Sequence, residues 1–285
     1  MQISVIVPFY QAERTIRRCL EALLAQDPTG HAYEILMVDN NATDRSAAIV
    51  AEYPGVKLLH EPSQGAYAAR NRALTEARGA WIAFTDPDCV PRRSWLRELT
   101  LPFRVPDVQM VVGRPLLDVR STAMATLQDY ERAKDEFVFG GDEPLVYYGR
   151  NNNMAVRRSL FEELGPFDEL RRGADVVLAR RCVDAHGCRS VVYAPDAEVL
   201  HLEMGDLATY YRKVFTYGRS VTRSRARAAG GVIDRRGRWR VIQETRSKNG
   251  YSTARTLLLL ALLGVEGCCW KLGSWAAREQ EGGPG

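Results

Sequence analysis

The chain has 285 residues, of which 46% are hydrophobic and 26% are charged, and its formal net charge is +4. These proportions are those of an ordinary globular protein, and they exclude a disordered, collagen-like or coiled-coil chain. The length suits one large α/β domain with an appendage as well as two domains.

The first 86 residues alternate apolar strands with amphipathic helices. Continuously apolar strands that alternate with helices of ten or more residues are typical of parallel βαβ units with both faces of the sheet covered. We therefore expect an α/β protein with a Rossmann-like, mostly parallel central sheet flanked by helices. The predicted strands are 3–10, 33–39, 55–61 and 80–86, and the predicted helices are 16–26, 41–53 and 63–78.

Polar residues follow each of these strands. Tyr10, Asp39, Glu61 and Asp86 stand at or just past a strand's end. Ligands of open α/β sheets bind outside the carboxyl ends of the strands. We expect the four loops to converge on a binding site at that edge.

The second half of the chain is less regular. A change of composition near Arg219 predicts a first domain, 1–218, and a C-terminal helical appendage, 219–285. The other predicted elements are strands 108–113 and 190–195, a strand running into a helix over 153–165, and helices 122–139 and 176–187.

The appendage combines basic with apolar residues. Residues 219–248 hold ten Lys and Arg against two acids, and 257–265 contain no polar side chain. Since a spanning helix needs about 20 apolar residues, we expect the apolar run to be too short and too interrupted to cross a membrane. Two alternatives stay open: an interfacial helix beside basic residues on an anionic membrane, and a helix packed on the protein's own core. Trp239 is the one stacking aromatic in the basic segment, which disfavours a nucleic-acid partner.

The cysteines indicate a reducing compartment. Six are present without a CxxC pair, and the N-terminus lacks the charged and apolar regions of a signal peptide. We expect a cytoplasmic protein, peripheral at the cytoplasmic face of the membrane if the appendage binds lipid.

Asp86 and Asp88 flank one proline after the fourth strand. Asp and Pro are common turn residues, so the tripeptide alone indicates a turn. At the carboxyl edge of a sheet, however, one or two carboxylates typically hold Mg²⁺ or Mn²⁺ together with phosphate oxygens and water. A phosphohydrolase of the haloacid-dehalogenase type, with Asp86 as nucleophile, is a third alternative. Against it, that motif usually opens its domain, whereas here a βαβ region precedes it.

Four further side chains have two interpretations each. Asp175 follows Gly173 at a helix start, where it is either an N-cap or a general base worth roughly 10²- to 10⁴-fold in rate. Asp39 is either a turn acid or an acceptor for a ribose or base. Arg70 is either a solvated helix residue or a partner of a base or phosphate, and His201 is either structural or a ligand.

These motifs together resemble the inverting nucleotide-sugar glycosyltransferases of family 2, which have the GT-A fold. The similarity covers about residues 2–217, and motifs in this order and spacing are a specific signal. The segments that carry it are SVIVPFYQAERTIRRCLEALLAQ, EILMVDNNATD, EPSQGAYAARN, WIAFTDPDC, GRNNNMAVRRSLFEELGPFDE and GADVVLARR.

The resemblance implies a role for each candidate residue. Asp175 would be the general base, Asp88 would bind the metal directly, and Asp86 would approach the ribose and the metal shell. His201 stands where some relatives supply a further metal or diphosphate contact. The residues implied for the nucleoside are Pro8, Phe9 and Tyr10 around the base with Glu13 nearby, Asp39 at the base or ribose, and Arg70 beside the base.

The resemblance also implies the reaction. A sugar would pass, with inversion and with Mn²⁺ or Mg²⁺, from a nucleoside diphosphate to a hydroxyl of a saccharide or lipid-linked acceptor; UDP is favoured, with GDP and dTDP open. Two positions depart from the family's pattern: Ala174 replaces a frequent Glu, which leaves Asp175 as the sole obvious base, and Asn40 replaces an acid. A non-catalytic nucleotide-sugar-binding module is the remaining alternative, and the retained acids argue against it.

Overall fold

The computed structural model describes residues 2–169, 172–228 and 233–281. By its internal contacts the chain forms two compact units. The sheet unit comprises Met1–Leu116 and Tyr147–Leu202, and the helical unit comprises Leu117–Val146 and Glu203–Gly285. Arg219, near which the composition changes, lies inside a helix of the helical unit and not between the two units. The change of composition reflects charge, whereas the units reflect packing.

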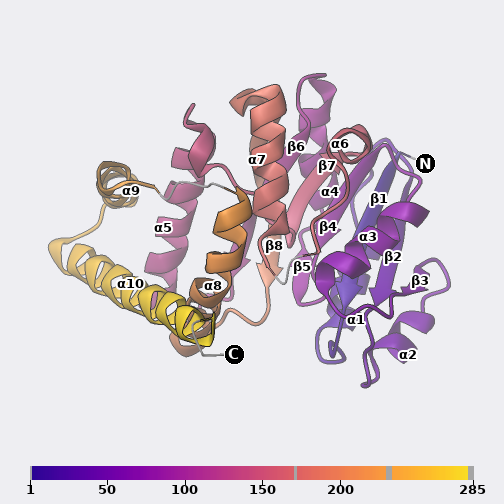
Figure 1. Cartoon of the computed structure of the whole chain (residues 1–285), viewed down its shortest axis with the longest axis horizontal. Helices are drawn as coiled ribbons and strands as arrows, with labels where there is room; N and C mark the ends of the chain where they lie inside the picture. The colour runs from indigo at the N-terminus through magenta and orange to yellow at the C-terminus, as the bar shows by residue number, and fades with distance from the viewer. Residues whose placement is uncertain (1, 170–171, 229–232, 282–285) are drawn as a thin grey trace. The chain divides into compact units, whose positions relative to one another are not determined.

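Within the described residues, eight strands form one sheet in the order β3-β2-β1-β4-β7-β6-β8-β5 (Figure 1). The first half is parallel: β1 pairs with β2 and β4, and β2 pairs with β3. The later strands join antiparallel, β7 to β4 and β6, and β5 to β8. The α/β class with a central sheet flanked by helices is confirmed. The strands are β1 Ile3–Phe9, β2 Tyr33–Asp39, β3 Lys57–His60, β4 Trp81–Thr85, β5 Cys89–Pro91, β6 Met110–Leu117, β7 Asn153–Arg157 and β8 Val191–His201.

The parallel half of the sheet is buried on both faces. Every residue of β1 is buried, and Ile16, Leu20 and Leu23 of the first helix have no exposed surface. This burial explains the continuous apolar strand, because neither face meets water. The helices of the sheet unit are α1 Ile16–Leu24, α2 Ser46–Ala51, α3 Ala66–Glu76, α4 Trp95–Thr100, α6 Arg158–Leu164 and α7 Ala174–His186, with short 3-10 turns at Leu101–Arg104 and Cys188–Ser190.

The helical unit buries two small apolar clusters between its helices. One cluster includes Leu127, Tyr210 and Leu262, and the other includes Tyr130 and Leu259. Both clusters join residues from the middle of the sequence to residues from its end, which apolar spacing alone does not reveal. The helices are α5 Thr122–Phe139, α8 Leu207–Ala228, α9 Arg235–Lys248 and α10 Thr253–Glu281, with a 3-10 turn at Pro144–Val146.

Helix α10 is longer than the sequence predicts. Within the described residues, Thr253–Ala277 is the one helical stretch that is long and apolar enough to cross a membrane, judged by length and composition alone. The expectation of a run too short to span is therefore wrong on length. Glu266 and the glycines around it do not interrupt the helix, and the Tyr210 hydroxyl donates to Glu266 Oε2 at 3.1 Å.

Candidate functional site

The ends of the parallel strands lie level at one edge of the sheet unit. Phe9 stands opposite Asp39, and Asp39 stands opposite His60. The N–H of Asn40 donates to the Phe9 carbonyl at 3.0 Å, and the N–H of Glu61 donates to the Asp39 carbonyl at 2.9 Å. The loops after the first three strands therefore start side by side, as the sequence predicts.

Asn40, where the family's usual acid is absent, connects the loop after β2 to the loop after β3. Its side chain is 3% exposed and donates to the carbonyls of Glu61 and Ser63 at 3.0 and 2.7 Å. Its carbonyl oxygen accepts from the N–H of Gly65, at the start of α3, at 2.7 Å. An amide can donate and accept at once, which a carboxylate cannot do. Asn40 therefore holds the loop edge in shape.

The predicted nucleoside residues differ in exposure. Pro8 and Phe9 are buried in β1, and the Phe9 side chain belongs to the core, whereas Tyr10 is 52% exposed. Glu13 is exposed, and its carboxylate accepts from the N–H of Arg45 at 3.1 Å. Tyr10 is thus the member of this set with the most surface to offer a ligand, while the binding roles of all four stay predictions.

Asp39 has a structural partner on each carboxylate oxygen. Oδ1 accepts from the N–H of Ala42 at 2.8 Å, and Oδ2 lies 3.7 Å from Nδ1 of His60. The turn contains Asn41 at a φ of 68°, in the left-handed region that Asn tolerates better than most residues. The turn interpretation of Asp39 is confirmed, and a contact to a nucleoside stays a prediction.

Arg70 and Asp86 form a close ion pair. The guanidinium Nη2 lies 2.5 Å from Asp86 Oδ1, and the arginine side chain is 4% exposed while that of the aspartate is 32% exposed. The interpretation of Arg70 as a solvated helix residue is therefore wrong. The guanidinium carbon also lies 5.5 Å from the ring centroid of Tyr67, one helical turn earlier. A charged pair that is this buried fixes the orientation of its members.

Asp88 meets His201 across the β5–β8 pairing. Cys89 stands opposite His201 in the register, so Asp88 Oδ2 lies 3.5 Å from His201 Nδ1. The ligand atoms of Asp88, Cys89 and His201 all lie within 4.8 Å of one another. A carboxylate and an imidazole suit Mn²⁺, whereas Mg²⁺ prefers oxygen alone and both ions are too hard for a thiol. The donor set therefore fits a divalent cation held by Asp88 and His201.

Asp175 does not cap its helix. The N-cap of α7 is Gly173, at a φ of 87° and without a side-chain capping bond, so the N-cap interpretation is wrong. Instead, Asp175 Oδ1 accepts from the hydroxyl of Tyr67 at 2.9 Å, and Oδ2 accepts from the N–H of Asn151 at 3.2 Å. Oδ1 also accepts from the N–H of Val176 at 3.0 Å. The carboxylate is thus held by α3 and by the loop before β7.

Burial makes Asp175 a stronger proton acceptor. Desolvation, the largest cause, raises the pKa of Asp175, and the hydrogen bonds from Asn151 and Tyr67 act in the opposite direction. Burial, followed by the charge of Asp175, raises the pKa of Tyr67, so its phenol stays protonated and donates. A raised carboxyl pKa brings a general base closer to neutral pH, where proton transfer is most efficient.

The loop before β7 supplies a residue that the sequence does not single out. Asn151 is 6% exposed, and neither polar atom of its side-chain amide has a hydrogen-bond partner among the residues that the structure describes. Buried amides without partners are rare in folded proteins. Gly149 lets this loop approach α7, since a Cβ there would lie 2.5 Å from the carbonyl oxygen of Asp175. The polar run GRNNN was the only signal of this feature, and nothing marked Tyr67.

The sheet order, the acidic loop after β4 and the helix start at α7 define the sheet unit as a GT-A domain. The model of glycosyl transferase family 2 matches residues 4–165, more than half of the chain. The protein belongs to glycosyl transferase family 2.

Similar proteins come from several organisms. The chain is 29% identical over 194 residues to glycosyltransferase AglE of Haloferax volcanii, covering 64% of this chain and 62% of that protein. It is 28% identical over 228 residues to pre-mycofactocin glycosyltransferase of Mycobacterium tuberculosis, covering 76% of this chain and 46% of that protein. The chain thus spans less than two thirds of the length of either relative.

Solved structures share the fold at low identity. Mannosyltransferase PcManGT of Pyrobaculum calidifontis, in complex with GDP-Man and Mn²⁺, aligns with a TM-score of 0.66 and 18% identity over 98% of this chain and 79% of that one. Glucosyl-3-phosphoglycerate synthase of Mycobacterium tuberculosis, in complex with Mn²⁺ and UDP-Glc, aligns with a TM-score of 0.57 and 16% identity over 81% of each chain.

Proposed function

We propose that the sheet unit catalyses metal-dependent, inverting transfer of a sugar from a nucleoside diphosphate to an acceptor hydroxyl. One observation carries this proposal: a chain of contacts joins the candidate base to the acidic motif. Asp175 accepts from the Tyr67 hydroxyl, the Tyr67 ring lies beside the Arg70 guanidinium, and Arg70 pairs with Asp86. The candidate base and the acidic motif that would bind the donor are thus connected through Tyr67 and Arg70 of helix α3.

The proposed chemistry is a single displacement. The ionised carboxylate of Asp175 takes the proton of the acceptor hydroxyl while the oxygen attacks the anomeric carbon. The bond from that carbon to the diphosphate breaks, its electron pair leaves with the nucleoside diphosphate, and the configuration inverts. The backbone N–H of Asn151 donates to Asp175 Oδ2, and the unpartnered side-chain amide of the same residue can bind a sugar hydroxyl there.

Asp88 and His201 would hold the divalent cation, Mn²⁺ or Mg²⁺, with Asp86 near the metal shell and the ribose. When bound, the cation neutralises charge that develops on the departing diphosphate. The imidazole favours Mn²⁺, and Mn²⁺ accompanies GDP-Man and UDP-Glc in the structural neighbours. UDP is our favoured nucleotide, with Tyr10, Asp39 and Arg70 toward the nucleoside.

We place the protein in the cytoplasm, at the membrane surface, with a saccharide or lipid-linked acceptor. Membership of family 2 disfavours the phosphohydrolase alternative. That alternative also needs Asp86 as a free nucleophile, whereas Arg70 holds one of its oxygens.

A screen of sugar nucleotides tests the proposal. UDP-Glc, UDP-GlcNAc and GDP-Man are added to the full chain with and without Mn²⁺, and the change in unfolding temperature is recorded. Each donor that stabilises the protein is then assayed for hydrolysis. We expect a donor whose effect needs Mn²⁺ and whose hydrolysis is lost in Asp175→Asn although its binding is retained. Unchanged hydrolysis in Asp175→Asn would remove the base assignment.

A further inference from the structure

Helix α10 exposes an apolar stripe. The large side chains on it are between 37% and 62% exposed. They are three, five or seven residues apart, which keeps them on one side of the helix. Between Thr253 and Ala277, Lys271 is the one charged residue of α10 that is exposed, and it lies on the same face as the apolar side chains. An exposed apolar stripe of this length, with a single cation in it, marks an interaction surface. Its large members are Leu257, Leu260, Val265, Leu272 and Trp275.

The opposite side of α10 is firmly packed within the helical unit. Leu259 and Leu262 are buried, and Glu266 is bonded to Tyr210 of α8. A Cβ at Gly273 would overlap the carbonyl oxygen of Phe215 in α8, so the two backbones touch. Crossing a bilayer would require α10 to give up these contacts and to carry Glu266 into hydrocarbon, where a carboxylate is costly. A position parallel to a surface keeps all of them.

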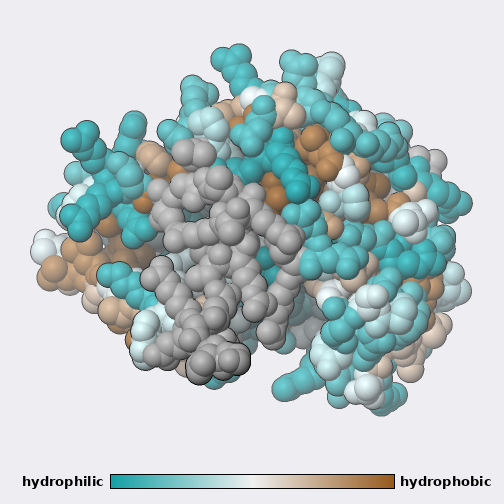
Figure 2. Space-filling view, in the orientation of Figure 1, coloured by the Kyte–Doolittle hydropathy of each residue, from teal (hydrophilic) through white to brown (hydrophobic). Residues whose placement is uncertain are grey.

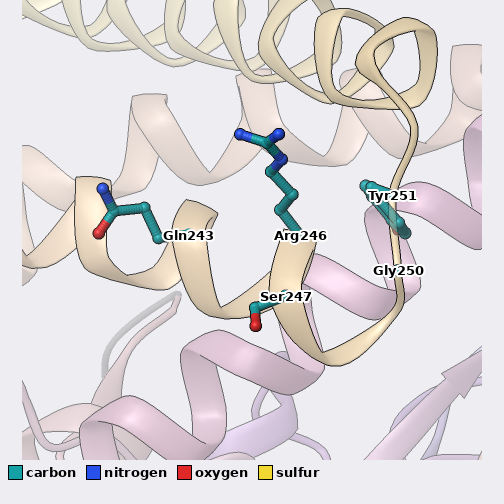
Figure 3. A pocket seen from close by; sticks show the side chains of 5 residues that line it. All are labelled: Gln243, Arg246, Ser247, Gly250 and Tyr251. Atoms are coloured by element: carbon teal, nitrogen blue, oxygen red, sulfur yellow. The ribbon is translucent and has the colours of Figure 1, made fainter.

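Helix α9 adds a basic groove that leads to the start of α10. The first part of this groove is shallow and open, and it is lined by one face of α9 with Arg236, Trp239, Arg240 and Gln243. The second part shares Gln243 and continues to the turn that precedes α10 (Figure 3). Its remaining lining residues are Arg246, Ser247, Gly250 and Tyr251.

Helix α9 carries a strong excess of positive charge. Its sequence RRGRWRVIQETRSK contains six basic residues and one acid, Glu244. Trp239, in the middle of the groove, is 57% exposed. Figure 2 shows hydrophilic side chains over α9 beside hydrophobic ones over the adjoining end of α10. Cationic side chains, an exposed Trp and an apolar stripe are the three features that bind a helical surface to anionic lipid headgroups.

We propose that the exposed stripe of α10 and the basic groove of α9 dock the helical unit onto an anionic lipid bilayer, with α10 lying in the interface. The apolar side chains enter the boundary between headgroups and acyl chains, and the arginines of α9 contact lipid phosphates. This inference names the surface and the lipid chemistry behind the proposed peripheral location. It depends on residues of the helical unit alone, so its test is independent of the test of sugar transfer.

Flotation of the full chain with vesicles tests this proposal. The vesicles are phosphatidylcholine alone or phosphatidylcholine with phosphatidylserine. We expect co-flotation with the anionic vesicles, weaker at high salt because salt screens the arginines. Since one basic residue near an anionic surface contributes about a fivefold change in partition, Arg236→Glu with Arg240→Glu should lower binding by about 25-fold or more. Leu257→Glu with Trp275→Glu should lower binding to both kinds of vesicle.

Matched controls lie in the sheet unit. Arg93, with a side chain 80% exposed, and Val105, 54% exposed, are changed to Glu and should leave flotation unchanged. Circular dichroism verifies the helix content of each variant. If one paired variant does not fold, the other paired variant still tests the proposal. The donor-induced change in unfolding temperature should be the same in all of them, which separates loss of docking from loss of donor binding.

Four results would overturn the proposal. The first is a wild-type protein that does not float with anionic vesicles. The second is equal flotation of the wild type and both paired variants. The third is binding that resists extraction by alkaline carbonate, since this would show an inserted helix. Retention on single-stranded RNA that is stronger than on anionic vesicles would assign the groove to nucleic acid and would count equally against docking.

Discussion

Tyr67 contacts both the candidate base and the arginine that pairs with the acidic motif. Its hydroxyl donates to Asp175, and its ring lies beside Arg70, the partner of Asp86. Tyr67 and Asp175 are 108 positions apart in the sequence, so no local pattern pairs them. Asp39, Asp86 and Asp88 were predictable from the sequence because they follow strand ends, whereas Asp175 stands at a helix start and was indicated by the resemblance to family 2. The groups that orient these acids were not predictable, since their role depends on contacts between distant segments.

Loss of the Tyr67 hydroxyl should shift the pH dependence of the reaction. The hydrogen bond from this hydroxyl lowers the pKa of Asp175, so Tyr67→Phe should raise that pKa further. A general base acts in its ionised form, and the acid limb of kcat/KM for donor hydrolysis should therefore move to higher pH. Tyr33→Phe is the control, since the Tyr33 hydroxyl donates to the Leu23 carbonyl. An unmoved limb would contradict the assignment of Asp175.

Removal of the Asp175 charge should stabilise the fold at neutral pH. The pKa of Asp175 is raised in the folded protein, so ionisation opposes folding, and the loss of stability grows as the pH rises from the unfolded pKa, about 3.9, through the folded one. Asp175→Asn should thus unfold at a higher temperature than the wild type at pH 7. This difference in unfolding temperature should become smaller at acid pH, where the wild-type carboxyl is protonated in both the folded and the unfolded state. A difference independent of pH would show that charge is not its cause.

At the scale of elements, α8 and α10 depend on glycine for their close approach. Side chains at Gly273 would overlap Phe215, whereas Gly264 on the same helix has nothing within 4 Å of its virtual Cβ. Gly273→Val should destabilise the helical unit by about 1 to 3 kcal/mol through overpacking. Gly264→Ala should instead be neutral or stabilising by up to about 1 kcal/mol, since alanine favours helix. Denaturant unfolding of both variants provides the comparison, and equal effects would refute the packing.

Strand β5 illustrates which elements escape prediction, whereas strands close to β6, β7 and β8 were predicted. The parallel half of the sheet was predicted because each strand is a continuous apolar run followed by a helix. Strand β5 has three residues, Cys89–Pro91, and follows the acidic motif directly, so it has no periodicity of its own. Its pairing with β8 is nevertheless what brings His201 to Asp88. The resemblance to family 2 indicated His201, whereas spacing alone did not.

At the scale of the whole molecule, the chain divides by packing and not by composition. The helical unit combines Leu117–Val146 with Glu203–Gly285, because α5 supplies the surface on which α9 and α10 pack. The bounds of α5 were predicted from the sequence, but its membership in the helical unit follows from contacts with the end of the chain. The sheet unit contains every residue proposed for catalysis, metal binding and nucleoside binding.

Calorimetric titration of the donor found in the screen tests the central claim most directly. The wild type, Asp88→Ala and Asp175→Asn are each titrated with and without Mn²⁺. We predict that the wild type and Asp175→Asn bind the donor with Mn²⁺, that only the wild type turns it over, and that Asp88→Ala loses the metal-dependent part of the binding. Donor binding to Asp88→Ala that equals the wild type in Mn²⁺ would contradict the proposed metal site.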